Sequence, residues 1–205
     1  MTLSKECFYT VPENSEFEID KIKGSRFIGR IFRVDSKEKA EEIITLNKKK
    51  FYDATHNCFA YKIGVGDRSL TRFSDDGEPS GTAGKPILSV IEGENITNTL
   101  VIVTRYYGGT KLGTGGLIKA YTLSAKEAIQ NIEKICVEIR SDIVFDFDYD
   151  MTSLVMNMIS AYEGKIMDEV YADNVSIVVN INNSFIMKFK NEIFEKSLGK
   201  ILVSV

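Results

Sequence analysis

The segment TRYYGGTKLGTGG, residues 104–116, combines five glycines with two basic residues and a pair of tyrosines. An apolar run typical of a buried strand precedes it and a helical pattern follows it, so the segment is a strand-to-helix turn. Such a turn aims backbone N–H groups and the positive end of the helix dipole at whatever lies above it. Glycines also let an anion approach the backbone closely. A phosphate site, a nucleic-acid contact and a tight structural corner would all produce this segment.

The glycine spacing does not match the common nucleotide-binding motifs. Gly108 and Gly113 have the separation of a Walker loop, but Thr114 stands where the lysine should be. The dinucleotide pattern also fails, because Ile118 replaces its third glycine. We therefore expect neither nucleotide hydrolysis nor a cofactor, and an anion site or a structural role for the glycines remains open.

A second polar segment, FSDDGEPSG, holds three carboxylates, those of Asp75, Asp76 and Glu78. Clustered carboxylates can bind Mg²⁺ or act as general acid and base. However, their spacing is not that of an EF-hand loop, and Asp-Gly and Pro-Ser-Gly are turn formers. A structural turn is the favoured interpretation, followed by a role facing an anion or a partner, and then by a metal site.

His56 and Cys58 are two residues apart on one face of an expected strand, which invites comparison with a Cys-His dyad. No aspartate or asparagine partner can be assigned from the sequence. His56 is the only histidine, and the three cysteines lack the C-x-x-C spacing of zinc sites. We expect no catalytic residue and no metal site, and we consider an enzymatic activity the less favoured alternative.

Hydrophobic periodicity, glycines and capping residues predict the elements of the first 134 residues. Asp35 or Ser36 would cap the first helix, and Thr82 would cap the second. The expected order is strands within 16–34 broken near Gly24, a helix over 35–51, a strand over 56–64, a short strand at 69–73, a helix over 82–93, a strand over 98–107 and a helix from 113 to 134.

The remaining residues repeat strand and helix patterns in the order β-α-β-β-α-β, which is typical of a ferredoxin-like domain. The pattern places a strand over 143–150, two strands within 165–181 joined at the Asp173-Asn174 turn, and a final strand over 200–205. Residues 1–134 carry 20 basic and 18 acidic residues, whereas residues 135–205 carry 6 and 11. Two domains, 1–134 and 135–205, are therefore expected, and the first is better suited to meet an anion.

The amino-terminal residues lack the apolar core of a secretory signal. No apolar run approaches the roughly 18 residues needed to cross a bilayer. We expect a cytoplasmic protein without a membrane partner.

Two long segments resemble the signature of the IMPACT family: RFSDDGEPSGTAGKPIL at 72–88 and VIVTRYYGGTKLGTGGLIKAY at 101–121, with THNCFAY at 55–61 before them. The resemblance extends over roughly residues 15–130 as the family's N-terminal domain. The tail resembles the small C-terminal domain of its bacterial members, which is similar to domain V of elongation factor G. The resemblance implies an α+β protein of two domains, an α/β sandwich like domain 2 of ribosomal protein S5 and a ferredoxin-like βαββαβ domain.

The resemblance also implies a function linked to translation, because eukaryotic members regulate translation initiation by competing for an activator of a stress kinase. No catalytic activity is established for the family, and nucleic-acid binding has been proposed for bacterial members. We expect a regulatory protein that binds RNA, the ribosome or a translation factor. The alternatives are an enzyme acting on a small phosphorylated substrate and a protein-interaction module; the oligomeric state stays open.

The predicted binding site is one concave surface made by the two signature segments. The members of this site would supply positive charge, close backbone approach, an aromatic surface and orienting carboxylates. They are Arg72, Asp75, Asp76, Glu78, Lys85, Arg105, Tyr107, Gly108, Gly109, Lys111, Gly113, Gly115 and Gly116.

Overall fold

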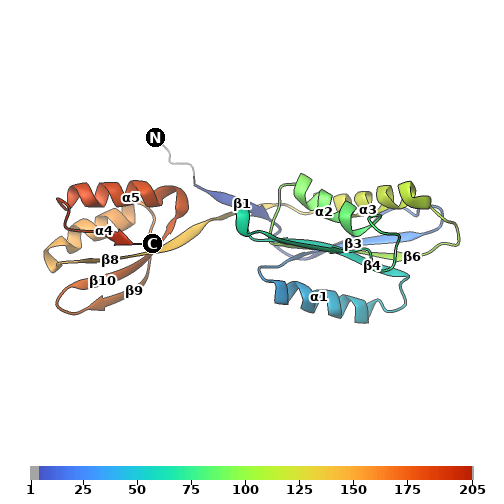
Figure 1. Cartoon of the computed structure of the whole chain (residues 1–205), viewed down its shortest axis with the longest axis horizontal. Coiled ribbons are helices and arrows are strands. Elements are labelled where there is room, and N and C mark those ends of the chain that lie inside the picture. Colours follow the sequence, from blue (N-terminus) through green and yellow to red (C-terminus); the bar gives the residue numbers. More distant parts are fainter. Residues whose placement is uncertain (1–4, 205) are drawn as a thin grey trace. The chain divides into compact units, whose positions relative to one another are not determined.

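A computed structural model describes residues 5–204 of the chain (Figure 1). These residues form two compact units, one over residues 8–136 and the other over residues 137–204 together with 5–7. The strands β1 (Cys7–Thr10) and β7 (Ile135–Glu138) lie where the chain passes from one unit to the other. Among the described residues, no helix has the length and apolar character required to cross a bilayer.

The first unit is built on an antiparallel sheet in which the described strands follow the order β2-β3-β6-β4-β5. Helix α1 covers one face of this sheet, and α2 and α3 cover the other (Figure 1). The strands are β2 (Ser15–Glu18), β3 (Arg26–Arg33), β4 (His56–Ile63), β5 (Leu70–Ser74) and β6 (Thr99–Tyr106). The helices are α1 (Lys37–Lys50), the 3-10 turn η1 (Gly66–Arg68), α2 (Gly84–Gly93) and α3 (Gly113–Gln130).

Strand β6 has the near-continuous apolar sequence expected of a strand buried on both faces. Val101 and Val103 pack toward α2 and α3, while Leu100 and Ile102 pack toward α1. Successive side chains of a strand point to opposite faces, so a single strand supplies both cores. This central position fixes the end of β6, from which the glycine-rich turn leaves the sheet.

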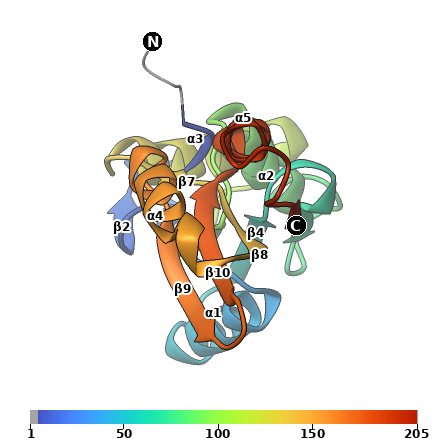
Figure 2. The ribbon, with the colours of Figure 1, turned by 90° about the vertical axis from the view of Figure 1, so that its left-hand side faces the viewer.

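The second unit confirms the predicted β-α-β-β-α-β order. Its described strands pair in the order β11-β8-β10-β9, and α4 and α5 lie together on one face of that sheet (Figures 1 and 2). The elements are β8 (Arg140–Phe147), the 3-10 turn η2 (Tyr149–Met151), α4 (Thr152–Ala161), β9 (Lys165–Tyr171), β10 (Val175–Asn182), α5 (Asn183–Lys196) and β11 (Val203–Ser204).

Alternation in β8 explains why its sequence mixes apolar residues with acids. Ile143 and Phe145 are buried under the helices, whereas Asp142 and Asp146 are exposed on the open face. The predicted strand over 143–150 is too long at its carboxyl end, because the chain turns into η2 at Tyr149.

Helices α1 and α2 match their predicted ranges within two residues, whereas α3 ends at Gln130, four residues before the predicted end, and one of the predicted caps is wrong. Ser36 caps α1 as expected, since its Oγ accepts a hydrogen bond from the backbone N–H of Lys39 at 3.3 Å. The Thr82 prediction is wrong, because this hydroxyl donates to the carbonyl of Pro79 at 2.7 Å. The start of α2 is held instead by Asp75, a residue that lies before the turn.

Candidate functional site

The two signature segments approach each other around one pocket of about 500 Å³, which we call the loop pocket. This volume falls within the range of small-molecule sites. The first segment contributes residues 78–79 from the turn after β5, and the second contributes residues from the end of β6 to the start of α3. Its walls include His56, Glu78, Arg105, Tyr107, Lys111 and Gly113.

Asp75 is used to build the turn between β5 and α2. One of its carboxylate oxygens accepts the backbone N–H groups of Ala83 and Gly84 at 2.9 and 2.8 Å, and the other accepts that of Gly81 at 2.9 Å. Side-chain acceptors at a helix start satisfy N–H groups that have no partner within the helix. The structural interpretation of this acid is therefore the one that its geometry supports.

Asp76 ties the same turn to neighbouring elements. Its Oδ2 accepts the backbone N–H of Asn57 at 2.6 Å, and its Oδ1 accepts from Nζ of Lys48 at 2.6 Å. Asp76 adopts a positive φ of 45°, an uncommon backbone state that aspartate tolerates better than most residues. Both carboxylates of the Asp-Asp pair are thus occupied by contacts within the unit.

Glu78 and Arg105 form a buried ion pair at the base of the loop pocket. The side chains are 3% and 6% exposed, and Nη1 of Arg105 lies 2.6 Å from Oε1 of Glu78. The hydroxyl of Tyr121 donates to the same oxygen at 2.8 Å, and Nη2 of Arg105 donates to Oγ of Ser25 at 3.3 Å. Because a buried carboxylate balances this guanidinium, Arg105 contributes little net charge to the pocket.

Tyr107 and Lys111 give the pocket its exposed aromatic and cationic surface. The Tyr107 ring is half exposed, and the Arg105 guanidinium carbon lies 5.5 Å from its centre. Lys111 is exposed on the glycine-rich turn. This pair differs from Arg105 in that both side chains can meet a molecule arriving from solvent.

The glycines of the turn serve two separate purposes. At Gly108 a Cβ would lie 1.9 Å from the carbonyl carbon of Gly24, so close backbone packing requires glycine there. Gly109 and Gly113 have φ of +86° and +73°, and a Cβ at either would meet nothing within 4 Å among the described residues. Gly108 therefore anchors the turn, while Gly109 and Gly113 leave its backbone open to solvent.

The start of α3 faces the same open turn. Leu112, which precedes the helix, has no side-chain oxygen that could cap it, and residues 113–116 include no acid. The first N–H groups of a helix lack partners within the helix and carry its positive dipole end. A ligand that accepts hydrogen bonds is chemically suited to this end of the pocket.

The pocket gathers some of the predicted residues and leaves others apart. Gly108, Gly109, Gly115 and Gly116 belong to the same turn and first helical turn as the pocket residues. Arg72 does not join them, because it lies on the α1 face of the sheet and pairs with Glu41. Lys85 is exposed on α2 and lies outside the pocket lining.

Several pocket residues were not predicted as members of the site. Thr55, Pro79, Leu112, Thr114 and Leu117 complete the lining. His56 also lines it, because β4 and β6 pair with His56 opposite Arg105. Strand register is set by the fold, so the sequence offered no signal that places His56 beside Arg105.

Cys58 does not form a reactive dyad with His56. The thiol is fully buried and its Sγ lies 3.0 Å from the carbonyl oxygen of Asp75. Burial raises the pKa of Cys58 to about 12, so the thiol stays protonated near neutral pH. Within residues 5–204, no three metal-ligating side chains come together as a metal site.

Comparisons with known proteins match both units. The family described as Impact N-terminal domain matches residues 23–129, and a Domain of unknown function (DUF1949) matches residues 145–200. An IMPACT family member of Haemophilus influenzae is 35% identical over 198 residues, which cover 96% of each chain.

Two further matches extend this result. Protein IMPACT of Oryctolagus cuniculus is 45% identical over 67 residues, covering 32% of this chain and 20% of that protein. The crystal structure of a hypothetical protein superimposes with a TM-score of 0.70 at 29% identity, covering 97% of this chain and 96% of that one.

Proposed function

The chain belongs to the IMPACT family, and we propose that it is a translation-associated cytoplasmic protein that binds RNA of the translation machinery at the loop pocket. The observation that carries this proposal is the placement of exposed Tyr107 and Lys111 beside the open backbone of the glycine-rich turn. An aromatic ring for base stacking next to a cation for phosphate is the usual composition of a single-strand binding surface.

The buried ion pair supports this role by preparing the aromatic surface. Arg105 is held by Glu78 and lies against the Tyr107 ring, so the ring has a fixed cationic neighbour on one side. A pre-positioned ring loses less conformational entropy when a base stacks on it. Arg105 thus acts as a positioning residue, and Lys111 is the residue that would contact phosphate.

The backbone supplies the second half of the proposed contact. Gly109 and Gly113 leave room for a phosphate near the turn, and the start of α3 presents N–H groups toward it. A phosphate held by backbone and lysine, with the adjoining base on Tyr107, fits a single nucleotide unit. The second unit of the chain has an excess of acids, so it is less suited than the first to meet a phosphate.

The proposal is tested by the salt dependence of RNA binding. A fluorescent oligouridine of about a dozen nucleotides would span a typical single-strand site. Lys111→Ala should weaken binding and reduce the slope of log affinity against log salt by about one. Tyr107→Ala should cost about 1–3 kcal/mol of binding free energy.

Lys126→Ala is the matched control, because Lys126 is exposed like Lys111 but lies farther along α3, outside the loop pocket. It removes the same charge and should leave both affinity and salt slope close to those of the original chain. Equal effects of Lys111→Ala and Lys126→Ala would show that only overall charge matters, and the proposed site would be wrong.

A second candidate is an enzyme acting on a small phosphorylated substrate in the same pocket, and His56 favours it. Its Nδ1 is 2.8 Å from the carbonyl oxygen of Asp76, and its Nε2 lies 3.9 Å from Oε2 of Glu78. A histidine oriented in this way has the geometry of a general acid or base. Saturable binding of a nucleoside monophosphate with turnover lost in His56→Ala, and no RNA binding, would favour the enzyme.

A further inference from the structure

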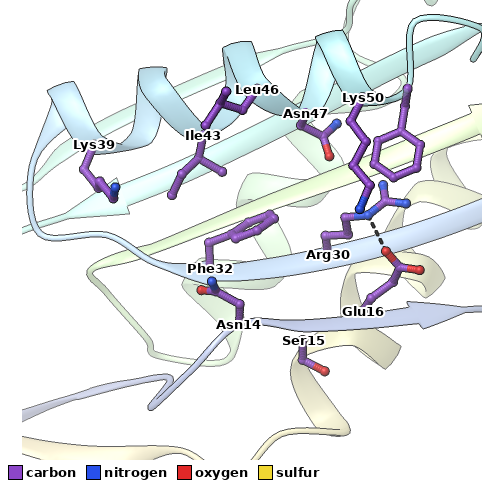
Figure 3. Close-up of a pocket in the computed structure, with 11 residues that line it drawn as sticks. Asn14, Ser15, Glu16, Arg30, Phe32, Lys39, Ile43, Leu46, Asn47 and Lys50 are labelled. Atoms are coloured by element: carbon purple, nitrogen blue, oxygen red, sulfur yellow. Dashed lines mark hydrogen bonds and ion pairs between the residues drawn. The ribbon is translucent and has the colours of Figure 1, made fainter.

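A second pocket, of about 470 Å³, lies between helix α1 and strands β2 and β3 (Figure 3). We call it the helix pocket. It belongs to the α1 face of the sheet, and it shares no lining residue with the loop pocket. Its floor is Arg30 of β3, and its walls come from α1 and from β2.

Arg30 is a buried arginine with one hydrogen-bonding group left over. Its residue is 5% exposed, and its guanidinium carbon stacks 3.6 Å from the centre of the Phe51 ring. Nε donates to Glu16 at 2.5 Å and Nη1 donates to Oγ1 of Thr104 at 2.8 Å. Nη2 is shielded from water and has no acceptor among residues 5–204. A buried charged donor without an acceptor is costly, so this nitrogen creates a demand for an anion.

The guanidinium is held in place by contacts other than its free nitrogen. Thr104 also donates to Oδ1 of Asn57 at 2.8 Å, and Nδ2 of Asn57 donates to the carbonyl of Phe51 at 3.2 Å. Nδ2 of Asn47 donates to the same Asn57 oxygen at 3.1 Å. This network fixes both the stacked ring and the arginine, so the site is formed before any ligand arrives.

The charges around Arg30 are unbalanced in favour of cations. Nζ of Lys50 lies 5.1 Å from the same Phe51 ring, and Figure 3 shows Lys50 and Arg30 reaching toward the same part of the pocket. Lys39 also lines the pocket, but its Nζ is paired with Glu42 at 3.0 Å, so the excess positive charge comes from Arg30 and Lys50. Glu16 is the one acidic residue among the described residues that line the pocket, and its side chain is 56% exposed. Solvent weakens its compensation of Arg30.

The other side of the helix pocket is apolar. Phe32, Ile43 and Leu46 form this wall, and Figure 3 shows the Phe32 ring and the Ile43 side chain facing each other. Leu46 is 55% exposed, so this wall reaches the molecular surface. The pocket therefore has a cationic end and an apolar end.

We propose that the helix pocket binds a small organic carboxylate whose anionic group lies between Arg30 and Lys50 and whose apolar body lies on Phe32, Ile43 and Leu46. A carboxylate fits better than a phosphate, because Arg30 and Lys50 together with Glu16 leave one net positive charge, and the free NH2 group of Nη2 can donate to a carboxylate oxygen. Lys50 is exposed, so its side chain is free to follow the anion. This site is independent of the function proposed for the loop pocket.

The test uses 4-phenylbutyrate as the probe and 4-phenylbutan-1-ol as its uncharged counterpart. Titration into the ¹⁵N-labelled full chain, followed by amide shifts, locates the probe and gives its affinity. We expect saturable shifts in α1, β2 and β3 with 4-phenylbutyrate, and at least about tenfold weaker binding of the alcohol, the factor that corresponds to one lost charged contact.

Lys50→Glu should weaken 4-phenylbutyrate binding by about tenfold or more while leaving alcohol binding within about twofold, because only the anionic end is altered. Lys49→Glu is the matched control, since Lys49 is the exposed neighbour on α1 that does not line the pocket. Leu46→Asp should weaken both probes through the apolar end. All three positions are exposed, so the variants are expected to fold.

Three results would overturn the proposal. The first is no saturable binding up to about 10 mM, the weak end of specific affinities. The second is equal weakening by Lys49→Glu and Lys50→Glu. The third is amide shifts that arise outside α1, β2 and β3.

Discussion

Arg105 and Arg30 are both buried in adjacent strands of one sheet, yet their surroundings differ. Arg105 faces a carboxylate whose side chain is 3% exposed, whereas Arg30 faces one that is 56% exposed. The charge at the base of the loop pocket is therefore balanced, and the proposed binding uses its exposed rim. Each arginine keeps one buried nitrogen without an acceptor among the described residues, Nε of Arg105 and Nη2 of Arg30, so the two sites differ in the exposure of the paired carboxylate. We infer that the buried charge serves structure in the loop pocket and the proposed ligand in the helix pocket.

Removing the buried arginine of the loop pocket should have the largest effect on stability. Arg105→Met leaves Glu78 without its cation and should lower the free energy of unfolding of residues 8–136 by about 3–5 kcal/mol. Hydrogen exchange of the β4 and β6 amides measures this loss within one unit of a two-unit chain. A loss below about 1 kcal/mol would mean that the pair is not structural.

The next effect concerns the turn that carries Glu78. Asp75→Ala removes the acceptor of three backbone N–H groups and should cost about 2 kcal/mol, seen as faster exchange at the start of α2. Thr82→Val is the matched control, because it removes the hydroxyl that the sequence suggested as the cap. Its cost should be smaller than that of Asp75→Ala, and the reverse order would refute the assignment of Asp75 as the cap.

Replacing the buried arginine of the helix pocket with methionine should have a much smaller effect on stability than Arg105→Met. Arg30→Met exchanges a buried arginine for an apolar side chain and leaves an exposed glutamate that water can solvate. We expect a change of about 1 kcal/mol or less, because no buried carboxylate is left alone. A loss comparable to that of Arg105→Met, again by hydrogen exchange, would erase the distinction between the two arginines.

The smallest effect should come from Glu16. Glu16→Gln removes an exposed partner of Arg30 and should change stability by less than about 1 kcal/mol. The same variant should tighten 4-phenylbutyrate binding, because the acid that competes for Arg30 is gone. Weaker binding by Glu16→Gln in the amide titration would show that Glu16 orients Arg30 rather than opposing the ligand.

Local patterns predicted the elements because they depend on neighbours in sequence. The apolar run of β6, the glycines after it and the Ser36 cap are all short-range signals. The cap by Asp75 was missed because the acceptor lies eight and nine residues before the N–H groups that it serves. Helix propensities favour the nearest hydroxyl, that of Thr82, as the cap, but the fold brings Asp75 to the start of α2 instead.

The contents of the pockets were harder to predict because they depend on strand register and burial. The sequence marked Arg105 and Glu78 as polar residues of one site, but it could not show that they neutralise each other. Arg72 was grouped with them, although the pairing of β5 with β4 places it on the α1 face. No sequence motif marks the helix pocket, since Arg30 is a polar residue within a predicted strand.

The most direct test of the account is an amide map of the ¹⁵N-labelled chain during titration with single-stranded oligouridine. If RNA binds at the loop pocket, the largest shifts should fall on residues 107–116 and 78–81, and Lys111→Ala should reduce them while Lys126→Ala should not. Shifts confined to the open face of the second unit, around Asp142 and Asp146, with residues 107–116 unchanged, would contradict RNA binding at the loop pocket.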